Sequence, residues 1–153
     1  LFENFAGIRI EKFDADFLEK DRDIRATYLG TDNYLMGVKM AEEAMALKPE
    51  GGSVCLQLGN VAADNINARA QGFRDTAGGG DGIDRLTGEN GWNEIEGCPV
   101  FTNDQADLAN QQMSDVFTAN PDLDAFILIG FALSVLCAVS AMLAYSLSAY
   151  TGS

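Results

Sequence analysis

The sequence contains no histidine and only three cysteines among its 153 residues. Without histidine the chain cannot form a Ser-His-Asp triad, a Cys-His nucleophile pair or a histidine-bearing zinc site. Cys55, Cys98 and Cys137 lie too far apart in the sequence for a C-x-x-C redox or zinc motif. Cys55 and Cys98 could form a disulfide in an oxidising compartment, leaving Cys137 over; otherwise all three are small buried hydrophobic residues.

Basic side chains are also scarce, since ten Lys and Arg stand against 23 Asp and Glu, for a net charge of −13. This balance argues against a nucleic-acid partner, because phosphates would be repelled. The glycine-rich stretch 78–97 contains no G-x-x-x-x-G-K-[ST] motif and does not pass directly from a strand into a helix. We therefore interpret it as a surface loop and expect no cofactor. Trp92 within it could stack on a ligand or pin the loop to the core.

No charged residue follows Asp124. The uncharged stretch 125–150 is long enough to span a bilayer, but its first six residues fit a strand and no Lys or Arg flanks it. A buried helix would need cover around its whole circumference, which a chain of this length cannot supply. We therefore interpret 131–153 as an anomalous apolar tail, foreign to the fold in the way that a shifted reading frame produces. A membrane segment is the second interpretation.

Short apolar runs alternate with amphipathic stretches along the rest of the chain. The runs predict strands at 7–13, 24–30, 53–59, 98–102 and 125–130, and the stretches predict helices at 31–49, 64–77 and 104–121. This alternation is typical of an α/β fold with three layers, in which helices flank a mainly parallel sheet.

Each predicted helix has one apolar face, and the first two also have a start signal. Thr31 or Asp32 can cap the first helix, and Asp64 can cap the second. The residues predicted to face inward are Met36, Met40, Ala44 and Leu47 in the first helix, Ile66, Ala70, Phe73 and Ala77 in the second, and Ala106, Ala109, Met113, Val116 and Phe117 in the third.

In parallel sheets, ligands bind at the carboxyl ends of the strands, so the junctions after the strands are the places to look for a site. Asp14 and Asp16 follow the first predicted strand. They could be an acid/base pair, metal ligands, acceptors for a hydroxylated ligand, or merely a solvated strand end. A calcium loop is a poor match, because no glycine follows closely, and we expect no metal.

Asn65 and Arg69 form a second candidate pair. They are one helical turn apart near the start of the second predicted helix, so their side chains can converge. The planar guanidinium of Arg69 suits vicinal hydroxyls or a carboxylate. The alternative is a surface arginine paired with Asp75 or another carboxylate.

Several motifs then occur in one order: G-T-D-N (30–33) opening a helix, R-x-x-G-F (69–73) on the next, G-C-P-V-F-T (97–102), and T-A-N-P-D-L-D-A-F (118–126) before a strand. Together they resemble the periplasmic sugar-binding proteins of bacterial ABC importers, of the ribose- and galactose-binding type. The resemblance extends from residue 7 to residue 130 and stops past Gly130.

The resemblance implies a two-lobed receptor that closes around one sugar. Residues 1–16 would end the first lobe, 17–24 would cross the hinge, and 25–130 would form part of the second lobe. The family chain is about twice as long, so the resemblance implies a fragment with half a cleft, for which we expect no measurable affinity for a monosaccharide. The intact protein would be a periplasmic monomer without enzymatic activity, partnered by the permease of its importer. We expect no signal peptide within residues 1–153, because the first residues show no basic region followed by an apolar one.

The resemblance also implies a substrate-binding set with members from each strand-to-helix junction: Asp14, Asp16, Asn65, Arg69, Asp104 and Gly130. Carboxylates would accept hydrogen bonds from sugar hydroxyls, and the arginine would donate them. Aromatic rings usually cover the apolar face of a sugar, and the local candidates are Phe13, Phe17 and Trp92.

Two rival functions belong to other classes. The first is the ligand-sensing domain of a lac-repressor-like, sugar-responsive transcription regulator, which shares the fold and would need an upstream helix-turn-helix domain. The second is an α/β enzyme acting on a nucleotide or sugar phosphate. We rank the enzyme last, because the sequence has neither a phosphate-cradling loop nor a nucleophile–base pair.

Overall fold

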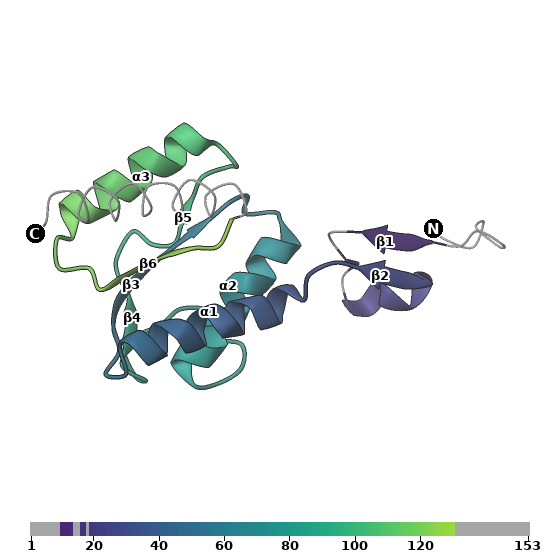
Figure 1. Ribbon diagram of the computed structural model, residues 1–153, viewed down its shortest axis with the longest axis horizontal. Helices are drawn as coiled ribbons and strands as arrows, with labels where there is room; N and C mark the ends of the chain where they lie inside the picture. The colour runs from purple at the N-terminus through teal and green to yellow at the C-terminus, as the bar shows by residue number, and fades with distance from the viewer. Residues whose placement is uncertain (1–9, 14–15, 18, 131–153) are drawn as a thin grey trace, which may run out of the picture.

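A computed structural model of the chain describes residues 10–13, 16–17 and 19–130 (Figure 1). The strands are β1 (Glu11–Phe13), β2 (Thr27–Leu29), β3 (Gly52–Leu58), β4 (Trp92–Glu94), β5 (Val100–Phe101) and β6 (Ala125–Leu128), and the helices are the 3-10 helix η1 (Glu19–Ile24), α1 (Asn33–Leu47), α2 (Asp64–Gly78) and α3 (Ala106–Ala119). The predicted tail 131–153 lies outside the described residues. Within the described part, no helix is long and apolar enough to cross a membrane.

Strand β3 is the centre of a parallel sheet. Val54 pairs with Glu94 of β4 and with Ala125 of β6, so these two strands lie on opposite edges of β3. Strand β5 pairs with the carboxyl half of β3, through Gln57 and Leu58, on the same edge as β4. The β4 and β5 strands thus follow one another along one side of β3, and β6 occupies the other.

Three layers result, as predicted from the alternation of elements. Figure 1 shows α3 on one face of the sheet and α1 with α2 on the other. Side chains of β3 alternate between these faces: Val54, Leu56 and Leu58 join the core under α1 and α2, whereas Gln57 donates a hydrogen bond to the Ala109 carbonyl of α3. Burial on both faces explains why the β3 sequence is a continuous apolar run.

The region 78–97 differs from the prediction of a surface loop, because it contains β4. Trp92 of β4 is buried in the core beside Leu86, so it pins this region to the core rather than covering a ligand. The strand was missed because only three residues pair with β3, and glycine-rich sequence surrounds them.

The predicted inward face is confirmed for α2 and wrong in part for the other two helices. Ile66, Ala70, Phe73 and Ala77 are all buried. In α1 the buried residues are Gly37 and Ala41, with Met40 and Ala44 packed at the core margin, whereas Met36 and Leu47 are 39% and 86% exposed. In α3 only Ala109 is buried, and Ala106 is exposed. Phe117 is 44% exposed, and one side of its ring packs against the ring of Phe126.

The apolar stripe of α1 was misassigned because two glycines let this helix approach α2 closely. A Cβ added to Gly37 would lie 1.9 Å from the Arg69 carbonyl oxygen, and one added to Gly72 would lie 2.1 Å from the Tyr34 carbonyl oxygen. The contact face of α1 is therefore centred on a residue without a side chain, and hydropathy cannot detect such a face.

The predicted caps differ in outcome. The cap of α1 is Asp32, as predicted, and it accepts a hydrogen bond from Leu35 N. The predicted cap Asp64 is instead the first residue of α2, which is preceded by Ala63 without a side-chain cap.

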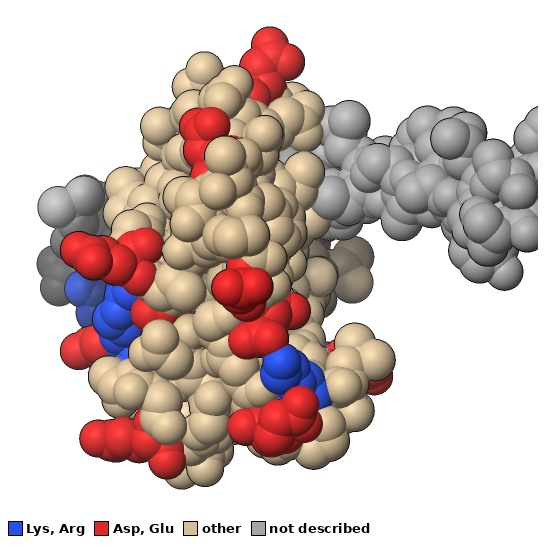
Figure 2. Space-filling view, turned by 90° about the vertical axis from the view of Figure 1, so that its left-hand side faces the viewer, with Lys and Arg blue, Asp and Glu red and all other residues tan. Residues whose placement is uncertain are grey.

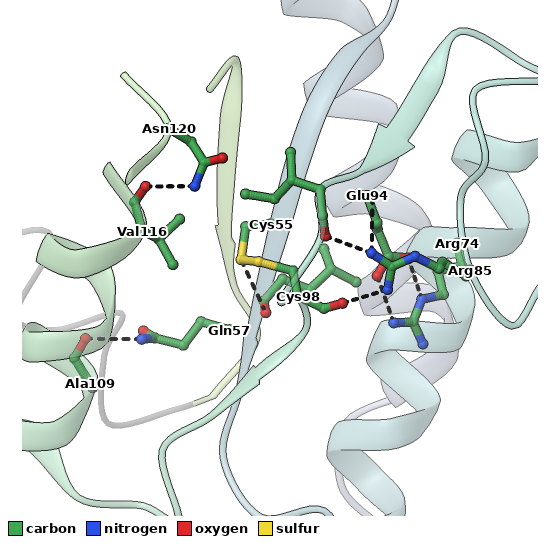
Figure 3. The surroundings of a disulfide bond; sticks show 11 residues. Cys55, Gln57, Arg74, Arg85, Glu94, Cys98, Ala109, Val116 and Asn120 are labelled. Carbon is green, nitrogen blue, oxygen red and sulfur yellow. Dashed lines mark hydrogen bonds and ion pairs between the residues drawn. A yellow bond between two sulfur atoms is a disulfide. The ribbon is translucent and has the colours of Figure 1, made fainter. Parts of the chain in front are cut away.

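A disulfide joins Cys55 of β3 to Cys98, with 5.4 Å between their Cα atoms (Figure 3). Cys137 lies outside the described residues. Beside this bond, Arg85 donates hydrogen bonds to the carbonyls of Cys98, Glu94 and Ile95. Arg74 forms a bidentate ion pair with the buried Glu94. The segment that connects β4 to β5 is thus held in place by a covalent bond and by charge-assisted hydrogen bonds.

A second, two-stranded sheet lies apart from the first in Figure 1, where β1 pairs in parallel with β2. Helix η1 connects these strands and occupies most of the predicted hinge crossing, 17–24. The division into lobes stays a prediction.

The space-filling view shows acidic side chains spread over the visible face with few basic ones between them, in keeping with the composition (Figure 2).

Candidate functional site

A polar cavity of about 490 Å³ lies between the amino-terminal segment and the first turns of α1 and α2. Its walls come from three parts of the chain: Asp16, Phe17, Arg22, Arg25 and Tyr28 from the segment around η1 and β2, Gly30–Tyr34 from the start of α1, and Asp64, Asn65 and Ala68 from α2. Most of these side chains can donate or accept hydrogen bonds, which is the lining that a hydroxyl-rich ligand needs.

Asp16 lies in this cavity and is held by two arginines. Both oxygens of its carboxylate accept hydrogen bonds from Arg25, at 2.5 Å from Nε and 2.7 Å from Nη2, and Nε of Arg22 lies 3.3 Å from the carboxylate. The hydrogen bond from Arg25 is the main reason why the pKa of Asp16 is lowered. Asp16 is therefore ionised at neutral pH and paired with two arginines, and its role as an acceptor for a ligand stays a prediction.

Arg69 connects three elements. Its Nε donates to Oδ1 of Asn33 at the start of α1 (2.8 Å), and its Nη1 donates to the carbonyl of Ile129 at the end of β6 (3.2 Å). Only 9% of the residue is exposed, and Asp75 bonds instead to Tyr34, Gln71 and Ile83. The alternative of a surface arginine paired with Asp75 is therefore wrong.

Asn65 lines the polar cavity, and Arg69 reaches it through Asn33. The side chain of Asn65 caps its own turn, because its Oδ1 accepts from Ile66 N at 3.0 Å. Arg69 is not itself among the lining residues, but its hydrogen-bond partner Asn33 is. The predicted pair thus lies on one face of α2, with Asn65 at the cavity wall and Arg69 one turn behind it.

Asp104 and Gly130 each lie beside Gly59, which directly follows β3. A Cβ added to Gly59 would lie 2.4 Å from Oδ1 of Asp104, and one added to Gly130 would lie 3.6 Å from Gly59 N. Asp104 has a φ of +59°, and its N–H donates to Oγ1 of Thr102. Gly130 directly follows the carbonyl that Arg69 binds, so the sheet edge brings Arg69, Asp104 and Gly130 into one region, as expected for parallel strands.

The remaining predicted residues divide as follows. Asp14 and the side chain of Phe13 lie outside the part of the chain that the structure describes. Phe17 lines the cavity, with the Lys12 ammonium 4.5 Å from its ring centroid. Among the described residues, no group of three His, Cys, Asp or Glu side chains could hold a metal ion.

Sequence reasoning missed Asn33 and Arg25 as residues of the cavity. Asn33 belongs to the G-T-D-N motif, but its partner Arg69 is 36 residues away in the sequence. Arg25 lies in a segment predicted only as a strand, and its pairing with Asp16 depends on the turn that η1 makes. Neither contact has a local signal in the sequence.

A larger hollow of about 590 Å³ lies elsewhere, between α1 and β6. Its lining is mostly apolar and includes Met40, Leu47, Phe126 and Leu128. A sugar needs converging donors and acceptors, so this groove does not suit one and the polar cavity remains the candidate site.

The sequence matches the family model described as periplasmic binding protein domain over residues 5–143, which extends past Gly130 into the uncharged segment. The comparison with curated protein sequences gave no significant match.

The structure is similar to several solved solute-binding proteins. A protein of an Agrobacterium vitis ABC transporter with bound α-D-tagatopyranose has a TM-score of 0.64 at 22% identity, with 83% of this chain and 41% of that chain covered. One from Burkholderia graminis in complex with D-arabinose has a TM-score of 0.62 at 22% identity, with 82% and 38% covered. The glucose-galactose binding protein GanP of Geobacillus stearothermophilus has 0.61 at 20%, with 80% and 39% covered. The chain spans about two fifths of the length of these structures, and the likeness establishes the α/β fold.

Proposed function

This chain belongs to the periplasmic binding protein domain family, and from that membership we propose that it forms one wall of a sugar-binding cleft. The complete protein would be the receptor of a bacterial ABC importer, located in the periplasm, acting as a monomer and delivering its ligand to the permease. It would hold a monosaccharide by hydrogen bonds and ion–dipole contacts without a covalent step. Family membership supports a binding protein rather than an enzyme.

The observation that carries this proposal is the polar cavity, in which residues from distant parts of the chain converge. Asp16 offers an ionised carboxylate, Asn65 an amide, and Asn33 an amide that is bonded to Arg69. Hydrogen bonds from or to charged groups are the strong ones, and they are strongest where water is excluded. Such a set selects a neutral, hydroxyl-rich ligand by the directions of its bonds.

The proposed roles follow from these donors and acceptors. Asp16, with Asp14 beside it in the sequence, would accept from sugar hydroxyls, and Arg69 would donate to the ring side of the sugar with Asn65 next to it. Asp104 would accept at the carboxyl end of the sheet, where Gly130 leaves room for the ligand. The solved relatives with D-arabinose and α-D-tagatopyranose support a monosaccharide as the ligand class.

Replacement of Arg69 by lysine tests the proposal. Lysine keeps the charge but lacks the planar fork of donors, so we expect the affinity for the sugar to fall at least about tenfold in a full-length protein that contains this chain. The affinity is measured by calorimetric titration with D-arabinose, D-fucose, D-tagatose, D-galactose and D-glucose.

The matched control is Arg85→Lys, because Arg85 also donates to backbone carbonyls but lies near the disulfide, away from the cavity. It should bind sugar as the unsubstituted protein does. Equal affinities for Arg69→Lys and the unsubstituted protein would contradict the assignment of Arg69. Failure of the unsubstituted protein to bind any of the five sugars would contradict the proposed ligand class.

A further inference from the structure

The guanidinium of Arg69 is held from two sides by groups outside its own helix. Asn33 Oδ1 accepts from Nε, and the Ile129 carbonyl accepts from Nη1. No hydrogen bond joins Nη2 to a residue that the structure describes, and Nη2 is the nitrogen that we assign to the ligand. One of the two anchors is a backbone carbonyl, which substitution cannot remove, and the other is the side chain of Asn33.

Asn33 is itself fixed in place. It is the first residue of α1, directly after the cap Asp32, and its Nδ2 donates to the Thr31 carbonyl at 3.1 Å. That bond assigns the nitrogen of the amide, so the oxygen must face Arg69. Asn33 also lines the polar cavity, and therefore connects the cavity wall to the arginine behind it.

The close packing of α1 on α2 sets the distance between the two residues. The backbone of Gly37, one turn after Asn33, lies against the Arg69 carbonyl, where a Cβ would lie only 1.9 Å from the oxygen. The relative position of the two helices is therefore determined at Arg69 itself. The short side chain of asparagine spans the remaining gap to Nε at 2.8 Å.

We propose that Asn33 is a positioning residue, which orients the Arg69 guanidinium before a ligand arrives. The inference rests on the proposed function in one respect, that Arg69 contacts the sugar. Orientation before binding removes the entropic cost of ordering a long side chain when the ligand binds, and so raises affinity. Removal of the amide should therefore release Nε and weaken binding, even though Arg69 remains.

The first test measures solvent exchange of the Arg69 Nε–H by NMR in the 153-residue chain, and needs no ligand. We expect Asn33→Ala to accelerate this exchange about tenfold, because the hydrogen bond that protects it is lost. Asn33→Asp keeps an acceptor oxygen and should retain the protection. The control Asn67→Ala removes an exposed amide of α2 that donates to the Val61 carbonyl, and should leave the exchange of Arg69 unchanged.

Unchanged exchange in a folded Asn33→Ala chain would overturn the proposal. If that variant does not fold, as judged by circular dichroism, Asn33→Asp decides: protection equal to that of the unsubstituted chain supports the proposal, and its loss overturns it.

The second test is calorimetric titration of the full-length protein with D-arabinose and D-fucose. Asn33→Ala should bind about tenfold more weakly than the unsubstituted protein, and Asn33→Asp should recover most of the affinity. Equal affinity in Asn33→Ala would overturn the proposal. If the unsubstituted protein binds neither sugar, the proposed function fails, whereas the exchange measurement still decides whether Asn33 positions Arg69.

Discussion

Individual carboxylates join segments of this protein that are far apart in the sequence. Asp124, just before β6, accepts a hydrogen bond from Lys48 Nζ at the end of α1 and two more from the N–H and Oγ of Ser53. These bonds, that from Lys48 first, lower the pKa of Asp124 to about 2. At Asp75, burial raises the pKa, but hydrogen bonds from Ile83 N–H, Gln71 and Tyr34 outweigh it and the pKa is lowered.

The lowered pKa of Asp124 predicts a defined pH dependence of stability. A carboxyl whose pKa is lower in the folded state stabilises the fold above its unfolded pKa of about 4, and this contribution is lost as the pH falls from about 4 to about 2. Asp124→Asn should therefore lower the thermal midpoint at pH 7, and the difference from the unsubstituted chain should shrink across that window. Thermal unfolding followed by circular dichroism measures it.

The control is Asp122→Asn, which alters an exposed carboxylate in the same turn. Its thermal midpoint should stay close to that of the unsubstituted chain at pH 7. A difference for Asp124→Asn that does not change between pH 7 and pH 2.5 would show that the loss comes from packing rather than from the charged hydrogen bonds.

At the scale of elements, the crossing of α1 and α2 positions the candidate site. Gly37 and Gly72 let the two backbones touch, and this contact brings the start of α1, with Asn33, over Arg69. The first turns of both helices also line the polar cavity. A change in the spacing of the helices therefore affects stability and the site together.

Gly37→Ala and Gly72→Ala should each destabilise the chain by about 1–3 kcal/mol or more, because the new methyl group meets a backbone carbonyl that cannot move without shifting a helix. Denaturant unfolding gives the free energy of unfolding. The matched control is Gly78→Ala at the end of α2, where the nearest atom is the flexible end of the Ile83 side chain at 2.3 Å. Equal losses in all three variants would contradict the role of the crossing.

At the scale of the whole molecule, one disulfide closes the unit around β3. It links the central strand to residue 98, across a sequence separation of 43, just before β5 begins. Cys55 and Cys98 are both buried, on the α3 side of the sheet where Gln57 also packs (Figure 3). The bond therefore joins the centre of the sheet to the edge formed by β4 and β5.

A chain with this disulfide reduced should be less stable by about 2–4 kcal/mol, since closing a long loop restricts the unfolded state. We expect a reductant to lower the thermal midpoint by roughly 5–15 °C. The double variant Cys55→Ala/Cys98→Ala should not respond to reductant, whereas Cys137→Ser should respond as the unsubstituted chain does. A response that disappears in Cys137→Ser would contradict the pairing.

The sequence by itself determined the class of the fold and the elements with strong local signals. The continuous apolar run of β3 predicted a strand covered on both faces, and the apolar stripe of α2 predicted its buried face, because each pattern repeats with the period of its element. The alternation of strands and helices predicted the parallel sheet. Parallel strands then place Arg69, Asp104 and Gly130 at one edge.

The tertiary structure alone decided the contacts that depend on distant partners. Strand β4 forms because β3 offers it an edge, and α1 buries Gly37 rather than Met36 because α2 approaches its backbone. The bonds of Asn33 to Arg69 and of Arg25 to Asp16 join residues that share no local pattern. Periodicity reports which face of an element is apolar, but a hydrogen bond between two elements depends on their packing distance, which no single segment encodes.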